Sequence, residues 1–173
     1  MKCLVVDVEA SGANKANPFG QSNQLCCIGL FDGVSYTYHD IEHSSLPYND
    51  ALNLVAQAIS RCEVLIGHNL KYDLNWLAHY IPTLSISNVW DTQLFEYLDS
   101  SQLWVMPSLT DSLVKSGLPA KSDLIKTEYW DKGLTTMQVP APLLREYNEY
   151  DCRGTYNLYL KQLDRLKPEQ TAL

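Results

Sequence analysis

The sequence predicts one mixed α/β domain over residues 1–173, in which a β-sheet carries helices on both faces. Three short apolar segments come first along the chain, and strand and helix patterns then alternate. With 46% hydrophobic residues, a chain of 173 residues can bury a sizeable core. Ligands of such sheets gather where strands end, so polar residues at strand ends indicate where a functional site lies.

Each strand is predicted by a short apolar or alternating run. Residues 4–8 are apolar and β-branched, as in a central strand. Asp32-Gly33 is a strong hairpin turn, and it joins residues 24–31 to an alternating return strand. The predicted strands are 4–8, 24–31, 34–39, 63–67 and 89–90.

Helices are predicted from apolar spacing and from capping residues. Asn49 or Asp50 caps the first helix, and Asp91 caps a later helix that runs through residue 98. Pro140 or Pro142 opens the long last helix, which ends before the next proline. The predicted helices are 50–59, 69–77, 92–98, 108–118 and 140–166, and residues 121–139 are expected to be irregular.

Composition excludes several classes of protein. The net charge of −7 argues against tight nonspecific coating of nucleic acid, although a site could supply positive charge as metal ions. The five cysteines are odd in number and form no C-x-x-C pair, so neither a disulfide framework nor a zinc knuckle is expected. They suit a reducing cytoplasm, of a bacterium or of a phage-infected host. The apolar runs are too short for a membrane span or a secretion signal, so no membrane partner is expected.

Two acidic residues lie at the end of the first predicted strand. Alternate residues of a strand point the same way, so Asp7 and Glu9 share one face. Two neighbouring carboxylates repel each other unless a cation lies between them. Taken alone, the pair is better explained by a strand that has reached solvent.

Two further pairs stand four residues apart on predicted helices. Asn69 and Asp73 share a face near a helix start, and Tyr147 and Asp151 share a face of the last helix. Taken alone, simple capping explains the first pair. A tyrosine packed on the sheet, with a solvated aspartate one turn on, explains the second.

The four carboxylates together predict a metal site. Oxygen ligands of this kind suit Mg²⁺ or Mn²⁺, whereas zinc prefers histidine and cysteine. Two such ions about 4 Å apart serve phosphodiester hydrolysis, one activating water and the other stabilising the leaving 3′ oxygen. The candidate ligands are Asp7, Glu9, Asp73 and Asp151.

These motifs, in this order, resemble the DEDDy class of 3′–5′ exonucleases. The likeness is strongest to the proofreading domain of family A DNA polymerases of the phage type, and it spans about residues 2–163. The histidine variant of the class has its base five residues before the last aspartate, where this chain has Glu146, so the tyrosine variant fits better. The motifs that carry the resemblance are Asp7-Val8-Glu9, Asn69-x-x-x-Asp73 and Tyr147-x-x-x-Asp151.

The resemblance implies a ribonuclease H-like fold and a catalytic set. Two Mg²⁺ or Mn²⁺ ions would be bound by the four carboxylates, with Asp7 bridging them and Asp73 acting mainly through water. Tyr147 would hold the attacking water, because a phenol of pKa near 10 is a weak base at neutral pH. The implied catalytic residues are Asp7, Glu9, Asp73, Tyr147 and Asp151.

The resemblance also indicates substrate contacts. Asn69 would help to seat the terminal nucleotide, and His68 beside it is a further candidate. The family often has a bulky apolar residue shortly after the first motif, where this chain has the small residues Ser11 and Ala13. Both are candidate substrate contacts, and Phe19 is the candidate wedge against the terminal bases.

The expected activity is proofreading: hydrolysis at the 3′ end of single-stranded or frayed DNA, with release of nucleoside 5′-monophosphates. The expected partner is a DNA polymerase module, fused or in trans, because an acidic domain binds DNA weakly alone. Two alternatives stay open. A ribonuclease D-like 3′–5′ RNA exonuclease shares the same catalytic pattern. A non-catalytic nucleic-acid-binding module would keep the fold, although such relics usually lose one of the carboxylates.

Overall fold

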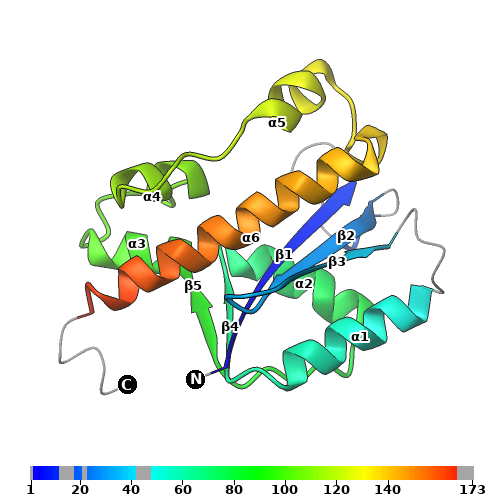
Figure 1. The fold of residues 1–173 in the computed structure, drawn as a ribbon, viewed down its shortest axis with the longest axis horizontal. Coiled ribbons are helices and arrows are strands. Elements are labelled where there is room, and N and C mark those ends of the chain that lie inside the picture. The colour runs from blue at the N-terminus through cyan, green and yellow to red at the C-terminus, as the bar shows by residue number, and fades with distance from the viewer. Residues whose placement is uncertain (1, 12–17, 21–22, 42–47, 167–173) are drawn as a thin grey trace.

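The computed structural model describes residues 2–11, 18–20, 23–41 and 48–166. Within these ranges, five strands form one mixed sheet in the order β3-β2-β1-β4-β5 (Figure 1). β1 is central, as the apolar run near the N-terminus predicts, and the structure shows it antiparallel to β2 and parallel to β4. The strands are β1 (Cys3–Ser11), β2 (Gln24–Phe31), β3 (Tyr36–Asp40), β4 (Val64–Gly67) and β5 (Val89–Asp91).

Helices cover both faces of the sheet, which confirms the predicted α/β class. The long helix α6 crosses one face, with α4 and α5 beyond it, while α1 and α2 lie against the other face (Figure 1). The helices are α1 (Tyr48–Ser60), α2 (Leu70–Tyr80), α3 (Thr92–Asp99), α4 (Leu109–Lys115), α5 (Leu124–Glu128) and α6 (Ala141–Leu163). Two 3₁₀ turns, Trp130–Lys132 and Thr136–Gln138, separate α5 from α6.

The alternation of β1 divides the core into two layers. Leu4, Val6 and Val8 pack with α1 and α2 in the larger apolar cluster. Val5 packs on the opposite face with residues of α6. Asp7 and Glu9 have the same parity as Val5, so the strand directs both carboxylates to the face that α6 covers.

The segment predicted to be irregular contains a short helix. Residues 124–128 form α5, because Ile125 is buried against Val139 and Leu144 in a third apolar cluster. These contacts join residues far apart in the sequence, so local periodicity does not reveal them. The last helix also ends at Leu163, three residues before the predicted end.

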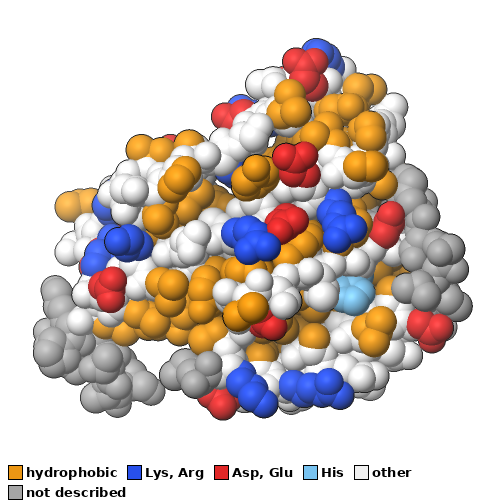
Figure 2. Space-filling model, in the orientation of Figure 1, with side chains coloured by type: hydrophobic (Ala, Val, Ile, Leu, Met, Phe, Trp, Pro, Cys, Tyr) orange, Lys and Arg blue, Asp and Glu red, His pale blue; other side chains and the backbone are white. Residues whose placement is uncertain are grey.

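The surface over α6 carries charges of both signs. On the face in Figure 2, the Lys and Arg side chains of the described residues are scattered among acidic and apolar ones. Such a face does not form the continuous basic strip that would grip a nucleic-acid backbone by charge alone. Among the described helices, none is long and apolar enough to cross a membrane.

Candidate active site

The carboxylates of Asp7, Glu9 and Asp151 lie together between β1 and α6. One carboxylate oxygen from each residue lies within 4.8 Å of the other two. Asp7 and Glu9 come from the same face of β1, and Asp151 comes from the buried side of α6. Strand alternation and helix packing thus bring together three residues that the sequence analysis selected.

A close approach of α6 to β2 fixes the position of Asp7. Gly29 of β2 stands opposite Asp7, and an added Cβ there would lie 1.6 Å from Oδ1 of Asn148. The missing side chain lets Asn148 donate from Nδ2 to Oδ2 of Asp7 at 2.7 Å. Tyr36 of β3 donates in turn to Oδ1 of Asn148 at 2.8 Å. The carboxylate of Asp7 is therefore held by a chain of hydrogen bonds from two other elements.

Asp73 reaches the site from the opposite layer. β4 pairs only with residues 3–5 of β1, so among the described residues no strand lies beside the edge of β1 beyond this point. Oδ1 of Asp73 accepts the Val8 amide N–H there at 2.9 Å. Asp73 lies outside the group of three oxygens above, but its charge interacts with that of Asp7. The structure therefore places it at the border of the cluster.

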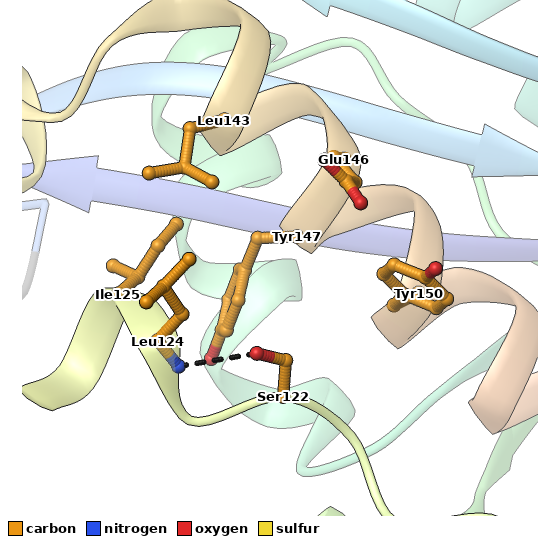
Figure 3. A pocket seen from close by; sticks show the side chains of 7 residues that line it. All are labelled: Ser122, Leu124, Ile125, Leu143, Glu146, Tyr147 and Tyr150. Atoms are coloured by element: carbon orange, nitrogen blue, oxygen red, sulfur yellow. Dashed lines mark hydrogen bonds between the residues drawn. The ribbon is translucent and has the colours of Figure 1, made fainter.

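Tyr147 and Asp151 lie one turn apart on α6, as their spacing predicts. The Tyr147 ring extends from α6 toward the segment that carries Ser122, Leu124 and Ile125 (Figure 3). Trp130 meets this ring edge-on, with centroids 5.7 Å apart. The packing holds the phenol beside the carboxylates.

Lys121 enters the same cluster from the segment between α4 and α5. Its Nζ donates to Oδ2 of Asp151 at 2.7 Å and to the Tyr147 hydroxyl at 2.6 Å. The other oxygen of Asp151, Oδ1, is buried and has no hydrogen-bond partner among the described residues. A buried carboxylate oxygen without a partner, beside two further carboxylates, fits a divalent cation.

Burial and mutual repulsion disfavour the charged form of these carboxylates. Burial, and next the charge of Asp151, raise the pKa of Asp7 to about 7. Burial, followed by the charge of Asp7, raises the pKa of both Glu9 and Asp73 well above its ordinary value. A bound cation would reverse this balance, because it favours the ionised carboxylates. The carboxylate cluster therefore favours the binding of a cation.

The candidate substrate contacts differ in exposure and in local contacts. Asn69 is exposed in a left-handed conformation with φ of 58°, at the start of α2. Ser11 is buried, and its Oγ accepts the Gln24 amide N–H at 2.9 Å. Phe19 is 76% exposed and touches His79 edge-on. Ala13 lies outside the described residues.

Both ring nitrogens of His68 have partners within the protein. Nδ1 lies 2.9 Å from Oγ1 of Thr92, and Nε2 lies 3.1 Å from the carbonyl oxygen of Pro107. Burial lowers the pKa of His68, which favours the neutral ring. His68 thus joins the end of β4 to the segment before α4, and its predicted contact with substrate stays a prediction.

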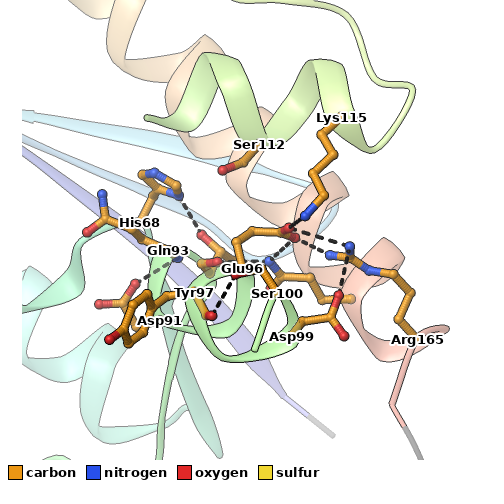
Figure 4. A network of polar contacts seen from close by, with 12 residues as sticks. His68, Asp91, Gln93, Glu96, Tyr97, Asp99, Ser100, Ser112, Lys115 and Arg165 are labelled. Atoms are coloured by element: carbon orange, nitrogen blue, oxygen red, sulfur yellow. Dashed lines mark hydrogen bonds and ion pairs between the residues drawn. The ribbon is translucent and has the colours of Figure 1, made fainter. Parts of the chain in front are cut away.

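Asp91 caps two helices in the polar network of Figure 4. It accepts the amide N–H groups of Gln93 and Leu94 at the start of α3, as predicted. It also accepts those of Asn69 and Leu70, at 3.1 and 2.9 Å. One carboxylate therefore fixes the backbone at Asn69 relative to β5.

A second part of this network anchors the far end of α6. Glu96 is fully buried and forms ion pairs with Lys115 of α4 and with Arg165 (Figure 4). Gln162 of α6 donates to Glu96 at 3.0 Å and accepts from Trp90 of β5. These contacts fix α6 across the sheet, and with it the positions of Tyr147 and Asp151.

Neither Lys121 nor Asn148 is among the site residues that the sequence motifs predict. Lys121 lies in a segment without periodicity, and only the fold brings it to Tyr147, 26 residues away. Asn148 follows a motif tyrosine and reaches Asp7 across 141 residues. The one local signal was the position of Asn148, three residues before Asp151 and hence near it on the helix.

The fold and the acidic cluster define a DEDD-type nuclease. The chain belongs to the 3′–5′ exonuclease family, whose model matches residues 1–167. The chain is therefore classed with exonuclease hydrolases. Among curated proteins, none matches the sequence significantly.

Solved structures share the fold at low sequence identity. Brucella melitensis NrnC bound to pGG is 20% identical with a TM-score of 0.65, over 97% of this chain and 74% of that chain. NrnC with bound Mg²⁺ is 20% identical with a TM-score of 0.63, over 97% and 75%. The EXO domain of Aedes aegypti Nibbler is 14% identical with a TM-score of 0.65, over 98% and 84%. These similarities confirm the ribonuclease H-like α/β fold.

Proposed function

We propose that this chain is a divalent-metal-dependent exonuclease that hydrolyses phosphodiester bonds at the 3′ end of single-stranded or frayed DNA and releases nucleoside 5′-monophosphates. The observation that carries the proposal is the group of carboxylates from Asp7, Glu9 and Asp151. Their oxygens lie within 4.8 Å of one another, and Oδ1 of Asp151 is buried without a partner among the described residues. Hard divalent cations bind such oxygens.

Each side chain has a proposed role. Asp7, Glu9 and Asp151 would hold one ion, and Asp7 with Asp73 would help to hold a second. When bound, Mg²⁺ or Mn²⁺ supplies Lewis acidity toward water and toward the phosphate. Burial, and next the charge of Asp151, raise the pKa of Tyr147 above its ordinary value, so the phenol stays protonated at neutral pH. Tyr147 therefore positions water or phosphate by a hydrogen bond.

We propose that the protein recognises the terminal nucleotide and the backbone phosphates of its substrate. Asn69 is exposed beside Asp73, with its backbone held by Asp91, so its amide can contact a terminal nucleotide. Contacts of this kind position a nucleic acid without reading its sequence. Low sequence preference suits proofreading, which must accept any mismatched terminus.

A polymerase module, fused or in trans, is the proposed partner. The net charge of −7 and the mixed charges over α6 give the domain little general attraction for DNA. A basic partner that carries the primer would deliver the 3′ end to the carboxylates, in the cytoplasm of a bacterium or of a phage-infected host.

The direct test is incubation with 5′-labelled single-stranded DNA, with and without Mg²⁺. We expect a ladder that shortens from the 3′ end with Mg²⁺ or Mn²⁺ and intact substrate in EDTA. The D151N variant should leave the substrate intact, while D131N, a matched change in the 3₁₀ turn after α5, should cleave like the wild type. Shortening from the 5′ end, or cleavage in EDTA, contradicts the proposal.

Two further arms test the substrate and the catalytic status. RNA of matched sequence tests the sugar, and faster loss of the RNA ladder would favour a ribonuclease over a proofreading enzyme. Ca²⁺ should support binding of the labelled strand without cleavage. Binding without cleavage in every metal would instead indicate a non-catalytic module.

A further inference from the structure

The ammonium group of Lys121 lies within the carboxylate cluster. Its Nζ is 2.7 Å from Oδ2 of Asp151, 2.6 Å from the Tyr147 hydroxyl and 4.4 Å from the centroid of the Tyr147 ring. The Lys121 side chain is only 18% exposed. A positive charge is thus built into the site beside the oxygens that suit a divalent cation.

The hydrogen bonds of Lys121 use some, but not all, of the donors and acceptors at Tyr147 and Asp151. An ammonium has three N–H donors and no acceptor, and Lys121 uses two of them on Tyr147 and Asp151. The Tyr147 hydroxyl accepts from Lys121, and its own proton faces Asp151, with which it forms a hydrogen bond. Asp151 uses Oδ2 for Lys121, while Oδ1 has no partner among the described residues. The lysine and a divalent cation can therefore share Asp151.

The positive charge of Lys121 affects both the carboxylates and any divalent cation that they bind. A lysine side chain has an ordinary pKa of about 10.4 and is charged at neutral pH, and the ammonium of Lys121 lies 2.7 Å from Oδ2 of Asp151. A charged ammonium reduces repulsion among the carboxylates and also repels a dication.

We propose that Lys121 is a positioning residue and an internal counter-ion, which orients the Tyr147 hydroxyl for reaction while weakening the binding of divalent cations to the carboxylates. This inference rests on the proposed exonuclease function. Removal of the Lys121 ammonium group should change metal affinity and turnover in opposite directions. The affinity for metal should rise, because a repelling charge is gone. The turnover should fall, because Tyr147 loses the donor that fixes its hydroxyl.

The test compares the wild type with K121M, K121Q and K121R. The matched control is K126M, which removes one positive charge from an exposed site on α5, outside the cluster. Titration calorimetry of the metal-free proteins with Mn²⁺ should give about tenfold tighter binding for K121M and K121Q. K121R and K126M should stay within about twofold of the wild type, because in both variants position 121 keeps its positive charge beside the carboxylates.

Turnover is measured on 5′-labelled single-stranded DNA at saturating Mn²⁺. We expect kcat of K121M and K121Q to fall at least about tenfold, with KM changed less than about threefold. K121R should recover part of the loss, and K126M should match the wild type. In the Y147F background, K121M should lower kcat by less than in the wild type, since the hydroxyl that it orients is absent.

Several outcomes overturn the inference. They are weaker Mn²⁺ binding by both neutral variants, unchanged kcat in both, or a full additive loss in the Y147F background. A parallel loss of metal affinity and kcat assigns Lys121 a structural role only. A wild type that binds Mn²⁺ but leaves DNA and RNA intact contradicts the proposed function, and the calorimetric comparison still tests the counter-ion.

Discussion

Nδ2 of Asn148 lies 2.7 Å from Oδ2 of Asp7, so an amide of the last helix holds the carboxylate of the first strand. The same Nδ2 lies 3.2 Å from the Asp7 carbonyl oxygen. One amide thus holds both the carboxylate and the backbone carbonyl of Asp7, and a carboxylate held in this way loses little freedom when a metal binds.

The Asn148 contact predicts the effect of two substitutions. N148A should lower cleavage about tenfold, the lower end of the effect expected when a partner of a metal ligand is lost. N148D should lower cleavage further, because it replaces the donor by a carboxylate that repels Asp7. Steady-state cleavage and Mn²⁺ titration check both, with the exposed Asn157 of α6 changed to Asp as control. Equal activity of N148D and N157D would contradict the positioning of Asp7.

The metal-free protein should become less stable as the pH rises toward neutrality. The folded protein holds a proton on Asp7 up to about pH 7, whereas the ordinary carboxyl releases it near 3.8. Between these values the folded state binds more protons than the unfolded chain, so the free energy of unfolding falls with rising pH. D7N removes this contribution. In EDTA at pH 7.5, we expect D7N to have a Tm about 4 °C above that of the wild type.

Thermal melts from pH 4.5 to 8 measure this difference directly. The gap between D7N and the wild type should widen as the pH rises and close again when Mn²⁺ is added to the wild type, which then regains stability by binding. A gap that narrows toward neutral pH in EDTA would show that burial and the charge of Asp151 do not disfavour the ionised form of Asp7.

Gly29 should not tolerate a side chain. In G29A the new Cβ meets Oδ1 of Asn148 at 1.6 Å and Sγ of Cys152 at 3.0 Å, so α6 must shift from the sheet. We expect a loss of about 3 kcal/mol in the free energy of unfolding, measured by urea denaturation. G154A in α6 is the control, since the nearest atoms to its Cβ belong to the flexible side chain of Leu113, at 3.2 Å. A G29A protein as stable as G154A would contradict the packing described.

Y147F should separate positioning from metal binding. The change removes one hydroxyl and keeps the ring against Trp130, so stability and Mn²⁺ affinity should change little. We expect kcat to fall about tenfold to a hundredfold, within the range for one positioned proton-handling group. D151N should lose more, because it removes a ligand charge. Y150F, on the exposed side of α6, is the control. A loss in Y147F equal to that in D151N would argue against a positioning role.

The parts of the fold and site that depend on local spacing could be predicted from the sequence. Alternation placed Asp7 and Glu9 on one face, and helical spacing placed Tyr147 beside Asp151. The short helix α5 forms because Ile125 is buried by residues far along the chain, so no local pattern marks it. Lys121 and Asn148 act through contacts across 30 and 141 residues, which only the folded chain creates.

The bond from the Val8 amide to Asp73 also bears on how an inactive form should be made. D73A would remove the acceptor and leave an unpaired amide on the open side of β1, where another chain could pair with it. D73N keeps an oxygen in the same place while it removes the charge. For trapping a bound oligonucleotide without inviting aggregation, the amide is the better replacement at this position.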